Sequence, residues 1–316
     1  MINRTEQNRT EQLRFHVKQI LKRLWYTLFT DHPYSYVSRI IIPILPNSYL
    51  SHLEDNFFCG KGPQGKISII VREETNRRYY SKTDNQIRKL NREKFWGAKS
   101  GKKWHDAKKE LYKDENKFEQ YLKFKSPLVK QISELCYSSR FKTICEIGTG
   151  TGMFLDYLSN QLSMVNEFIG IDLNKEQILE NQQNYNNPKL KFIKTEIAEF
   201  VNKSCGNSTI FVACGVFEYF TQNELEELFQ LISKKVKPAA IAISEPINLD
   251  LKNDFLSKPR GNIAYSHNYP YLMKKYNYHI FQKEVLHINP VIPFYDSVIM
   301  VGTNFYAYKQ PQKKEA

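Results

Sequence analysis

The sequence lacks an apolar run long enough to cross a membrane, and it lacks closely spaced cysteines. A spanning helix needs roughly 18 or more consecutive apolar residues, and no stretch of the 316 residues reaches that length. The five cysteines are scattered along the chain, which indicates reduced thiols rather than ligands of a metal ion. The opening residues, Met-Ile-Asn-Arg-Thr-Glu, are too polar and acidic for a signal peptide. We therefore expect a cytoplasmic protein.

The sequence also lacks a P-loop, although glycines cluster between residues 60 and 65. Gly60-Lys-Gly-Pro-Gln-Gly65 has neither the Lys-Ser/Thr ending nor the following apolar helix that such a loop needs. Hydrophobic residues are not scarce, since they make up 41% of the chain. This content excludes a disordered chain and predicts a sizeable core.

Acidic residues are outnumbered mainly in the first part of the chain. The formal net charge is +13; residues 1–124 hold 25 Lys and Arg against 14 Asp and Glu, whereas residues 125–316 hold 21 against 19. The basic surface therefore belongs to the N-terminal region. Such a surface suits RNA, an anionic membrane or an acidic substrate, and charge alone does not choose among them.

Two helical regions are indicated before residue 125. Residues 13–29 carry apolar residues on one side and Lys and Arg on the other, which predicts a basic amphipathic helix. This helix either packs on a catalytic domain or lies in an anionic membrane interface as a peripheral contact. Residues 83–124 have a charged helical pattern with many aromatic residues, and we expect a cap whose aromatic side chains face inward. The predicted divisions are a basic helix with an apolar segment, an irregular and then helical cap region, a catalytic domain and a tail: residues 1–46, 47–124, 125–310 and 311–316.

Beyond residue 125, short apolar runs alternate with amphipathic helical patterns. This alternation is typical of βαβ units around a mainly parallel sheet. The capping box Thr221-Gln-Asn-Glu224 predicts the start of one of the helices. Two long apolar runs near the end predict a terminal hairpin. The candidate strands are Thr143–Ile147, Phe168–Asp172, Leu190–Lys194, Thr209–Ala213, Ala239–Ser244, Tyr278–Leu286 and Ser297–Tyr308.

A glycine-rich turn follows the first of these strands. Glu146-Ile-Gly-Thr-Gly-Thr-Gly152 leads from the strand into an apolar helix; glycines let a ligand approach the backbone, and the helix start offers unpaired N–H groups. Twenty residues later, Asp172 ends the second strand, where a carboxylate can bind both hydroxyls of a ribose. A nicotinamide dinucleotide would fit this spacing too, but its G-x-G-x-x-G pattern would need glycine at Met153.

The acidic G-x-G-x-G turn, the spaced Asp172 and the terminal hairpin together resemble the class I S-adenosylmethionine-dependent methyltransferases over about residues 125–310. The resemblance implies a Rossmann-like α/β fold with a seven-stranded, mainly parallel sheet, helices on both faces, and S-adenosylmethionine as the cofactor. It implies that Glu146 lies near the methionine part of the cofactor and that Asp172 binds the ribose. The implied cofactor-binding residues are Glu146, Gly148, Gly150, Gly152, Asp172, Glu196, Ile197, Cys214 and Gly215.

The methyl acceptor is expected at the carboxyl ends of the fourth and fifth strands, where open α/β sheets keep their ligand crevice. Glu218 has three interpretations there: a general base, a ligand for an amine, or an anchor for a neighbouring loop. The insertion after the fifth strand is polar and aromatic, which suits a hydroxylated acceptor such as a sugar or glycolipid. Its His267 is the first candidate for a general base, with bonding to loop backbone as the alternative. The predicted acceptor-binding residues are Tyr219, Glu245, Tyr265, Asn268 and Tyr269.

These observations favour transfer of a methyl group to an oxygen of a small-molecule or glycan-type acceptor. The fourth strand runs into Ala213-Cys-Gly-Val-Phe-Glu218, whereas enzymes that methylate the amines of bases typically have Asn/Asp-Pro-Pro-Tyr/Phe there. Two alternatives remain. One is an RNA methyltransferase that holds phosphates with the basic N-terminal region, and the other is a membrane-associated interaction protein without catalysis. No metal ion is predicted.

Overall fold

The computed structural model describes residues 85–137, 141–203, 206, 208–247, 257–260, 264–286 and 297–304. The chain divides into two compact units, Met1–Thr83 and Asp84–Ala316, and the described residues all belong to the second. The amphipathic helix predicted over residues 13–29, the glycines at 60–65 and the C-terminal tail lie outside the described residues. Within these ranges, none of the helices is both long and apolar enough to cross a membrane.

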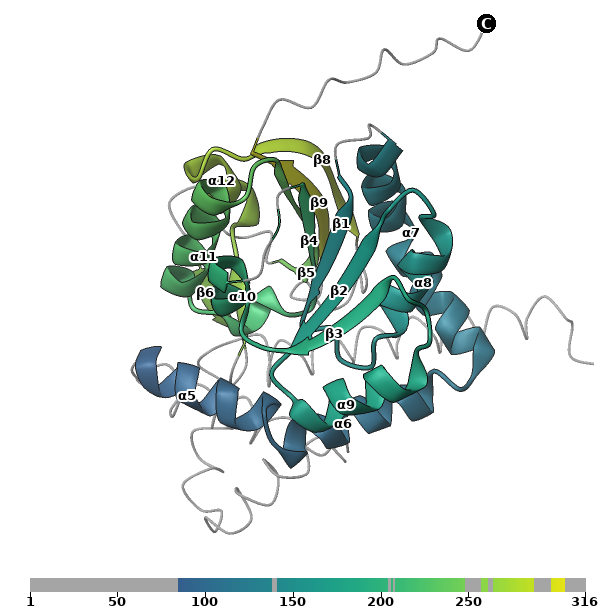
Figure 1. Cartoon of the computed structure of the whole chain (residues 1–316). Coiled ribbons are helices and arrows are strands. Elements are labelled where there is room, and N and C mark those ends of the chain that lie inside the picture. Colours follow the sequence, from purple (N-terminus) through teal and green to yellow (C-terminus); the bar gives the residue numbers. More distant parts are fainter. Residues whose placement is uncertain are drawn as a thin grey trace, which may run out of the picture. The chain divides into compact units, whose positions relative to one another are not determined.

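A seven-stranded sheet forms the centre of the second unit (Figure 1). Its strand order is β3-β2-β1-β4-β5-β9-β8. The first five strands run parallel, and β9 is antiparallel to both of its neighbours, β5 and β8. The predicted Rossmann-like fold with a C-terminal hairpin is therefore confirmed. The strands are β1 Thr143–Ile147, β2 Glu167–Asp172, β3 Leu190–Lys194, β4 Thr209–Cys214, β5 Ala239–Pro246, β8 His279–Leu286 and β9 Ser297–Thr303.

Helices cover both faces of this sheet, with α7, α8 and α9 on one side and α10, α11 and α12 on the other (Figure 1). Because successive side chains of a strand point to opposite faces, Cys145 and Ile147 of β1 enter one core, and Ile144 enters the other. The central strands are thus apolar on both faces, as parallel sheets require. The helices are α5 Asn85–Trp96, α6 Lys99–Leu111, α7 Glu115–Tyr137, α8 Met153–Gln161, α9 Lys175–Asn184, α10 Ile197–Lys203, α11 Gln222–Lys235 and α12 Tyr269–Lys275, with a 3₁₀ turn at Phe217–Tyr219.

The predicted capping box begins α11. The Thr221 hydroxyl accepts from the backbone N–H of Glu224 at 3.3 Å, and the Glu224 carboxylate accepts from the backbone N–H of Thr221 at 2.8 Å. Two otherwise unpaired donors at the helix start are thereby satisfied.

Three features differ from the sequence-based expectations. The insertion after the fifth strand contains a two-stranded hairpin, β6 Ser257–Arg260 and β7 Ala264–His267, followed by α12. Helix α7 runs without a break across the boundary expected between residues 124 and 125, because its apolar side continues into the core beneath the sheet. The last strand ends at Thr303, and residues 305–308 of the predicted strand lie outside the described part.

Candidate functional site

The glycine turn after β1 has the backbone conformation that its composition predicts. Gly148, Gly150 and Gly152 have φ of 64°, 51° and 75°, a left-handed region that disfavours residues with a Cβ. A Cβ on Gly148 would also lie 2.8 Å from the Val216 side chain, and one on Gly150 would lie 3.1 Å from the His105 ring. The turn therefore requires glycine both for its conformation and for the space around it.

Asp172 joins the end of β2 to this turn. One carboxylate oxygen accepts from the Gly150 N–H and the other from the Asn174 N–H, both at 2.9 Å. Each oxygen keeps a further lone pair, and the side chain lines the cavity described below. Asp172 thus holds the loop in shape and presents acceptors to a ligand.

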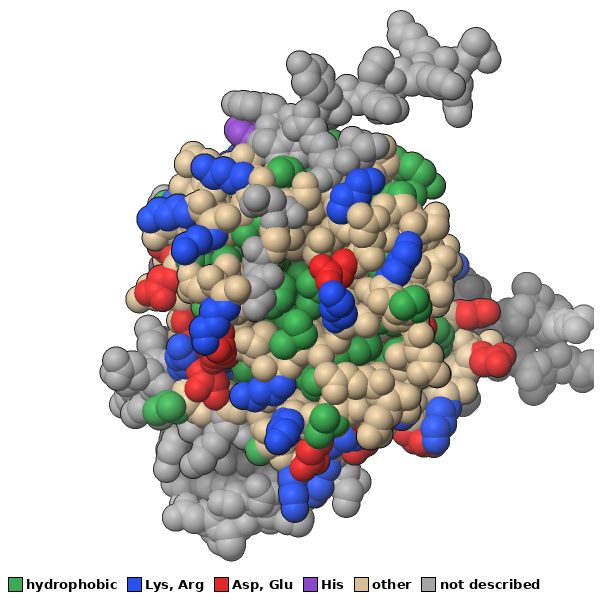
Figure 2. Space-filling view, viewed as in Figure 1, with side chains coloured by type: hydrophobic (Ala, Val, Ile, Leu, Met, Phe, Trp, Pro, Cys, Tyr) green, Lys and Arg blue, Asp and Glu red, His purple; other side chains and the backbone are tan. Residues whose placement is uncertain are grey.

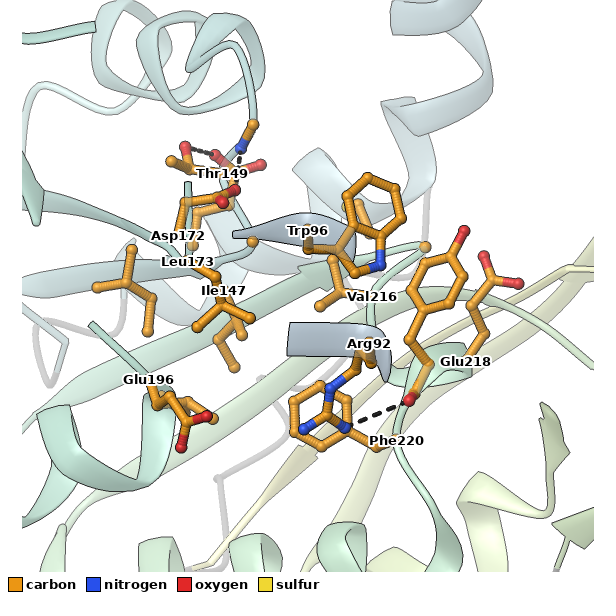
Figure 3. Close-up of a pocket in the computed structure, with 18 of the residues that line it drawn as sticks. Arg92, Trp96, Ile147, Thr149, Asp172, Leu173, Glu196, Val216, Glu218 and Phe220 are labelled. Carbon is orange, nitrogen blue, oxygen red and sulfur yellow. Dashed lines mark hydrogen bonds between the residues drawn. The ribbon is translucent and has the colours of Figure 1, made fainter. Parts of the chain in front are cut away.

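A cavity of about 570 Å³ lies over the glycine turn and the end of β4, within the range of about 300–1,000 Å³ typical of ligand sites. Figure 3 shows Thr149 and Asp172 on one side of the cavity and Glu218 on the other, with Trp96 between them. Glu196 lies apart from both groups. The structure thus brings most of the sequence-predicted residues together. Those that line the cavity are Glu146, Gly148, Gly150, Asp172, Glu196, Ile197, Cys214, Gly215, Glu218 and Tyr219.

Gly152 has a different position. It precedes the first residue of α8 as the N-cap and is not among the cavity-lining residues. A Cβ there would lie 2.9 Å from the Tyr185 ring and 3.0 Å from the Phe192 ring. Gly152 therefore lets the helix pack closely on two aromatic side chains.

Helices α5, α6 and α7 supply the aromatic wall of the cavity. Trp96, Trp104, Tyr112 and Tyr121 all line it, and the Trp96 ring lies 5.1 Å from the Tyr219 ring and 6.3 Å from the Trp104 ring, centroid to centroid. This wall of the cavity is therefore aromatic. On the face of the molecule shown in Figure 2, hydrophobic side chains lie between charged ones.

His105 of α6 is a cavity residue that the sequence analysis did not select. Its side chain is 6% exposed and lies against Gly150. Its Nε2 and the Nε1 of Trp96 are buried without a hydrogen-bond partner among the described residues. Buried polar atoms are nearly always bonded in native proteins, so two such atoms lining one cavity indicate a ligand. Motif spacing in the sequence could not identify His105 as a site residue, because α6 lies more than 30 residues before the glycine turn.

Glu146 is the acidic residue beneath the glycine turn. It is 4% exposed, and its carboxyl group accepts from the Thr149 hydroxyl at 2.6 Å. Burial raises the pKa of Glu146 to about 8, against smaller lowering contributions from the Thr149 hydrogen bond and from Lys125. Near neutral pH this carboxyl group therefore holds a proton in the ligand-free protein. A bound cation would favour its ionised form.

Glu245, a predicted acceptor-binding residue, instead supports the loop after β4. It is fully buried, and its carboxylate accepts from the backbone N–H groups of Val216 at 2.8 Å and Phe217 at 3.0 Å. Burial raises its pKa to about 7, partly opposed by these backbone hydrogen bonds. Glu245 thus orients the segment that presents Glu218 and Tyr219, without lining the cavity itself.

His267 and its neighbours also lie outside the cavity lining. The His267 side chain is fully buried; its Nδ1 is 2.5 Å from the Ser257 hydroxyl across the β6–β7 hairpin, and its ring contacts those of Tyr265 and Tyr269. Asn268 caps α12 by accepting from the Tyr271 N–H at 3.2 Å. The structure does not bring these residues to the site, because the inserted segment folds back as a hairpin and helix that pack on the core.

Comparison with known proteins finds similarity over part of the chain. Residues 144–239 match a family model described as a methyltransferase domain. No curated protein matches the sequence. Among solved structures, the magnesium protoporphyrin IX methyltransferase of Synechocystis PCC 6803 with bound S-adenosylmethionine is 12% identical; the match covers 69% of this chain and 97% of that chain, with a TM-score of 0.49. The N-methyltransferase NodS of Bradyrhizobium japonicum WM9 is 14% identical, with 57% and 96% covered and a TM-score of 0.44.

Proposed function

Because residues 144–239 match a methyltransferase domain, we propose that the protein is a class I S-adenosylmethionine-dependent methyltransferase that transfers the methyl group to an oxygen of a small, ring-containing acceptor. One observation supports this most strongly. The glycine turn, Asp172 and the end of β4 line the same cavity as an aromatic wall from α5, α6 and α7. That arrangement suits a cofactor and a small acceptor bound side by side.

The residues present fit the cofactor. The positive-φ glycines and the N–H groups at the start of α8 suit the part of the cofactor that would lie along the protein backbone. Asp172 suits the ribose hydroxyls of the cofactor, and Glu146 suits the ammonium group of its methionine part. When bound, the cofactor would supply an electrophilic methyl group on a sulfonium. The contribution of the protein is then to align the acceptor oxygen in line with that methyl and to exclude water.

The wall of the cavity supports an acceptor with a flat, largely apolar body. Trp96, Trp104 and Tyr219 offer ring faces and edges, which bind planar rings well. A glycan acceptor loses its basis, since it depended on Tyr265, Asn268 and Tyr269, none of which lines the cavity. The RNA alternative depends on the 25 basic residues of residues 1–124, of which 13 lie outside the described part of the chain.

Glu218 is the proposed general base for the acceptor hydroxyl. It lines the cavity beside Tyr219 and is 9% exposed, and a carboxylate held at this place can accept the hydroxyl proton as the methyl is transferred. We expect Glu218→Gln to lower turnover by about 100-fold and to leave the affinity for S-adenosylhomocysteine within about twofold. Glu199→Gln, on an exposed part of α10, is the control. Equal turnover of the two variants would remove Glu218 from the mechanism.

The raised pKa of Glu146 predicts a pH dependence of cofactor binding. Below pH 8 the carboxyl group must lose its proton to face an ammonium group, so affinity should rise by up to about tenfold per pH unit and level off above pH 8. Conversely, the raised pKa stabilises the cofactor-free fold most below pH 4.5, and this contribution is lost as the pH rises through about 8. Calorimetric titrations across this range check the slope. Glu146→Gln should abolish it, and a slope that survives in this variant contradicts the assignment.

The reaction itself can be tested with small-molecule extracts. Purified protein, radiolabelled S-adenosylmethionine and fractionated extract should yield a labelled, methylated small molecule that mass spectrometry identifies. Label that appears only in RNA, or no consumption of the cofactor in any fraction, would contradict the proposal.

A further inference from the structure

Lys108 is a cavity residue whose charge the proposed function leaves unexplained. It projects from α6 into the cavity, and its ammonium group lies 6.0 Å from the centre of the Trp104 ring. No ion pair joins it to a carboxylate in the described ranges, whereas Lys102 of the same helix, which does not line the cavity, pairs with Glu180 at 2.8 Å. The lysine that lines the cavity thus lacks the carboxylate partner that Lys102 has.

The ionisable groups around Lys108 do not neutralise it. Its electrostatic neighbours are Lys125, Cys214 and Glu146. Lys125 carries the same charge and donates to the Ser244 hydroxyl at 2.8 Å. Burial raises the pKa of Cys214 to about 12 and that of Glu146 to about 8, so both groups are mainly uncharged at neutral pH. Partial desolvation by the surrounding cavity walls and the repulsion from Lys125 lower the pKa of Lys108 itself.

Lys108 is accessible to solvent, and as a cation that lines the cavity without a counter-ion it can bind an anion that enters there. The position of Lys108 identifies the anion, because Glu146 and Cys214 lie in β1 and β4, next to the expected methionine part of the cofactor. That part carries one ammonium and one carboxylate group. A cavity end with one acidic and one basic side chain is complementary to such a zwitterion.

We propose that Lys108 binds the carboxylate of the methionine part of S-adenosylmethionine, while Glu146 faces its ammonium group. This inference rests on the proposed cofactor site. It assigns a cofactor-binding residue to a cap helix, outside the residues 144–239 that match the family model. It also links cap and cofactor, because α6 holds Lys108 over one part of the cavity and His105 against the glycine turn.

Calorimetry with two ligands tests the proposal. S-adenosylhomocysteine carries the carboxylate, and methylthioadenosine lacks the whole amino-acid end. We expect Lys108→Met to weaken binding of S-adenosylhomocysteine by roughly 10- to 100-fold, the contribution of one hydrogen bond to a charged group, and to leave binding of methylthioadenosine unchanged. Lys108→Arg should retain most of the affinity. Lys103→Met, an exposed lysine of the same helix, is the matched control.

The outcomes separate this proposal from the proposed function. If the wild-type chain binds neither ligand, the cofactor assignment fails first. If the wild type binds S-adenosylhomocysteine and Lys108→Met binds it equally well, the assignment of Lys108 alone is overturned. Equal losses for both ligands also overturn it, because the effect would not come from the carboxylate. Unchanged thermal unfolding of the variants without ligand establishes that they are folded.

Discussion

Asp172→Ala is expected to weaken binding of S-adenosylhomocysteine by about 100-fold or more, the largest binding effect of any single side chain in this site. The carboxylate has two roles that the substitution removes together. It would accept hydrogen bonds from the ribose, and it accepts from Gly150 and Asn174 at 2.9 Å. Without it, the Gly150 N–H loses its acceptor and the turn loses its link to β2.

Asp172→Asn separates these two roles. An amide keeps one acceptor oxygen for a backbone N–H but cannot accept with both of its ends, so we expect an intermediate loss of affinity and a smaller loss of stability than with alanine. Glu199→Ala, on the exposed side of α10, serves as the control. Calorimetry measures affinity and thermal unfolding measures stability. Wild-type affinity in Asp172→Ala would refute the location of the cofactor site.

Arg92→Met is expected to cause the largest loss of stability, about 2–3 kcal/mol, as the removal of one partner from a largely buried ion pair does. The Arg92 guanidinium donates to both Glu224 carboxylate oxygens, at 3.0 and 2.9 Å, and to the Tyr219 carbonyl at 3.3 Å. Its centre also lies 4.5 Å from the Phe220 ring centroid (Figure 3). The substitution leaves Glu224 with its charge partly buried and frees α5 from the start of α11.

The measurement is urea unfolding without ligand, where the midpoint should fall, together with a melting temperature lower by about 5–10 °C. Lys113→Met is the control, because its ion pair with Glu110 is exposed on both sides, and such pairs contribute about 0.5 kcal/mol or less. Arg92→Met combined with Glu224→Gln should recover part of the loss, since the amide oxygen can still accept from the Thr221 N–H and no unpaired charge then remains. A change in Arg92→Met as small as in the control would show that α5 is held by other contacts.

The elements with a clear local pattern were predicted well. β1 and β3 have the residue bounds expected from their apolar runs, and the capping box at Thr221 begins α11 as its spacing indicates. The glycine turn was predicted equally well, because its function depends on a backbone conformation that requires glycine, and the three glycines are visible in the sequence. These features are determined by neighbours within a few residues.

The hairpin β6–β7 and the histidine within it show where sequence patterns fail. A histidine can occur both in a catalytic site and in a packed core, so the residue type of His267 does not distinguish the two. Its burial against Tyr265, Tyr269 and Ser257 shows that it belongs to the core. Polar and aromatic residues in an insertion therefore indicated an exposed binding surface, whereas Tyr265, His267 and Tyr269 are buried where the segment folds onto the core.

The sequence by itself determined the sheet, the glycine turn and the acid that follows it, and hence the class of cofactor. Only the tertiary structure decided which side chains enclose the cavity. Trp96, His105 and Lys108 lie on helices that precede the turn by more than 30 residues. A helical pattern in the sequence does not predict which other segments those helices will pack against. Local pattern encodes local conformation, whereas the acceptor side of the site arises from packing between distant segments.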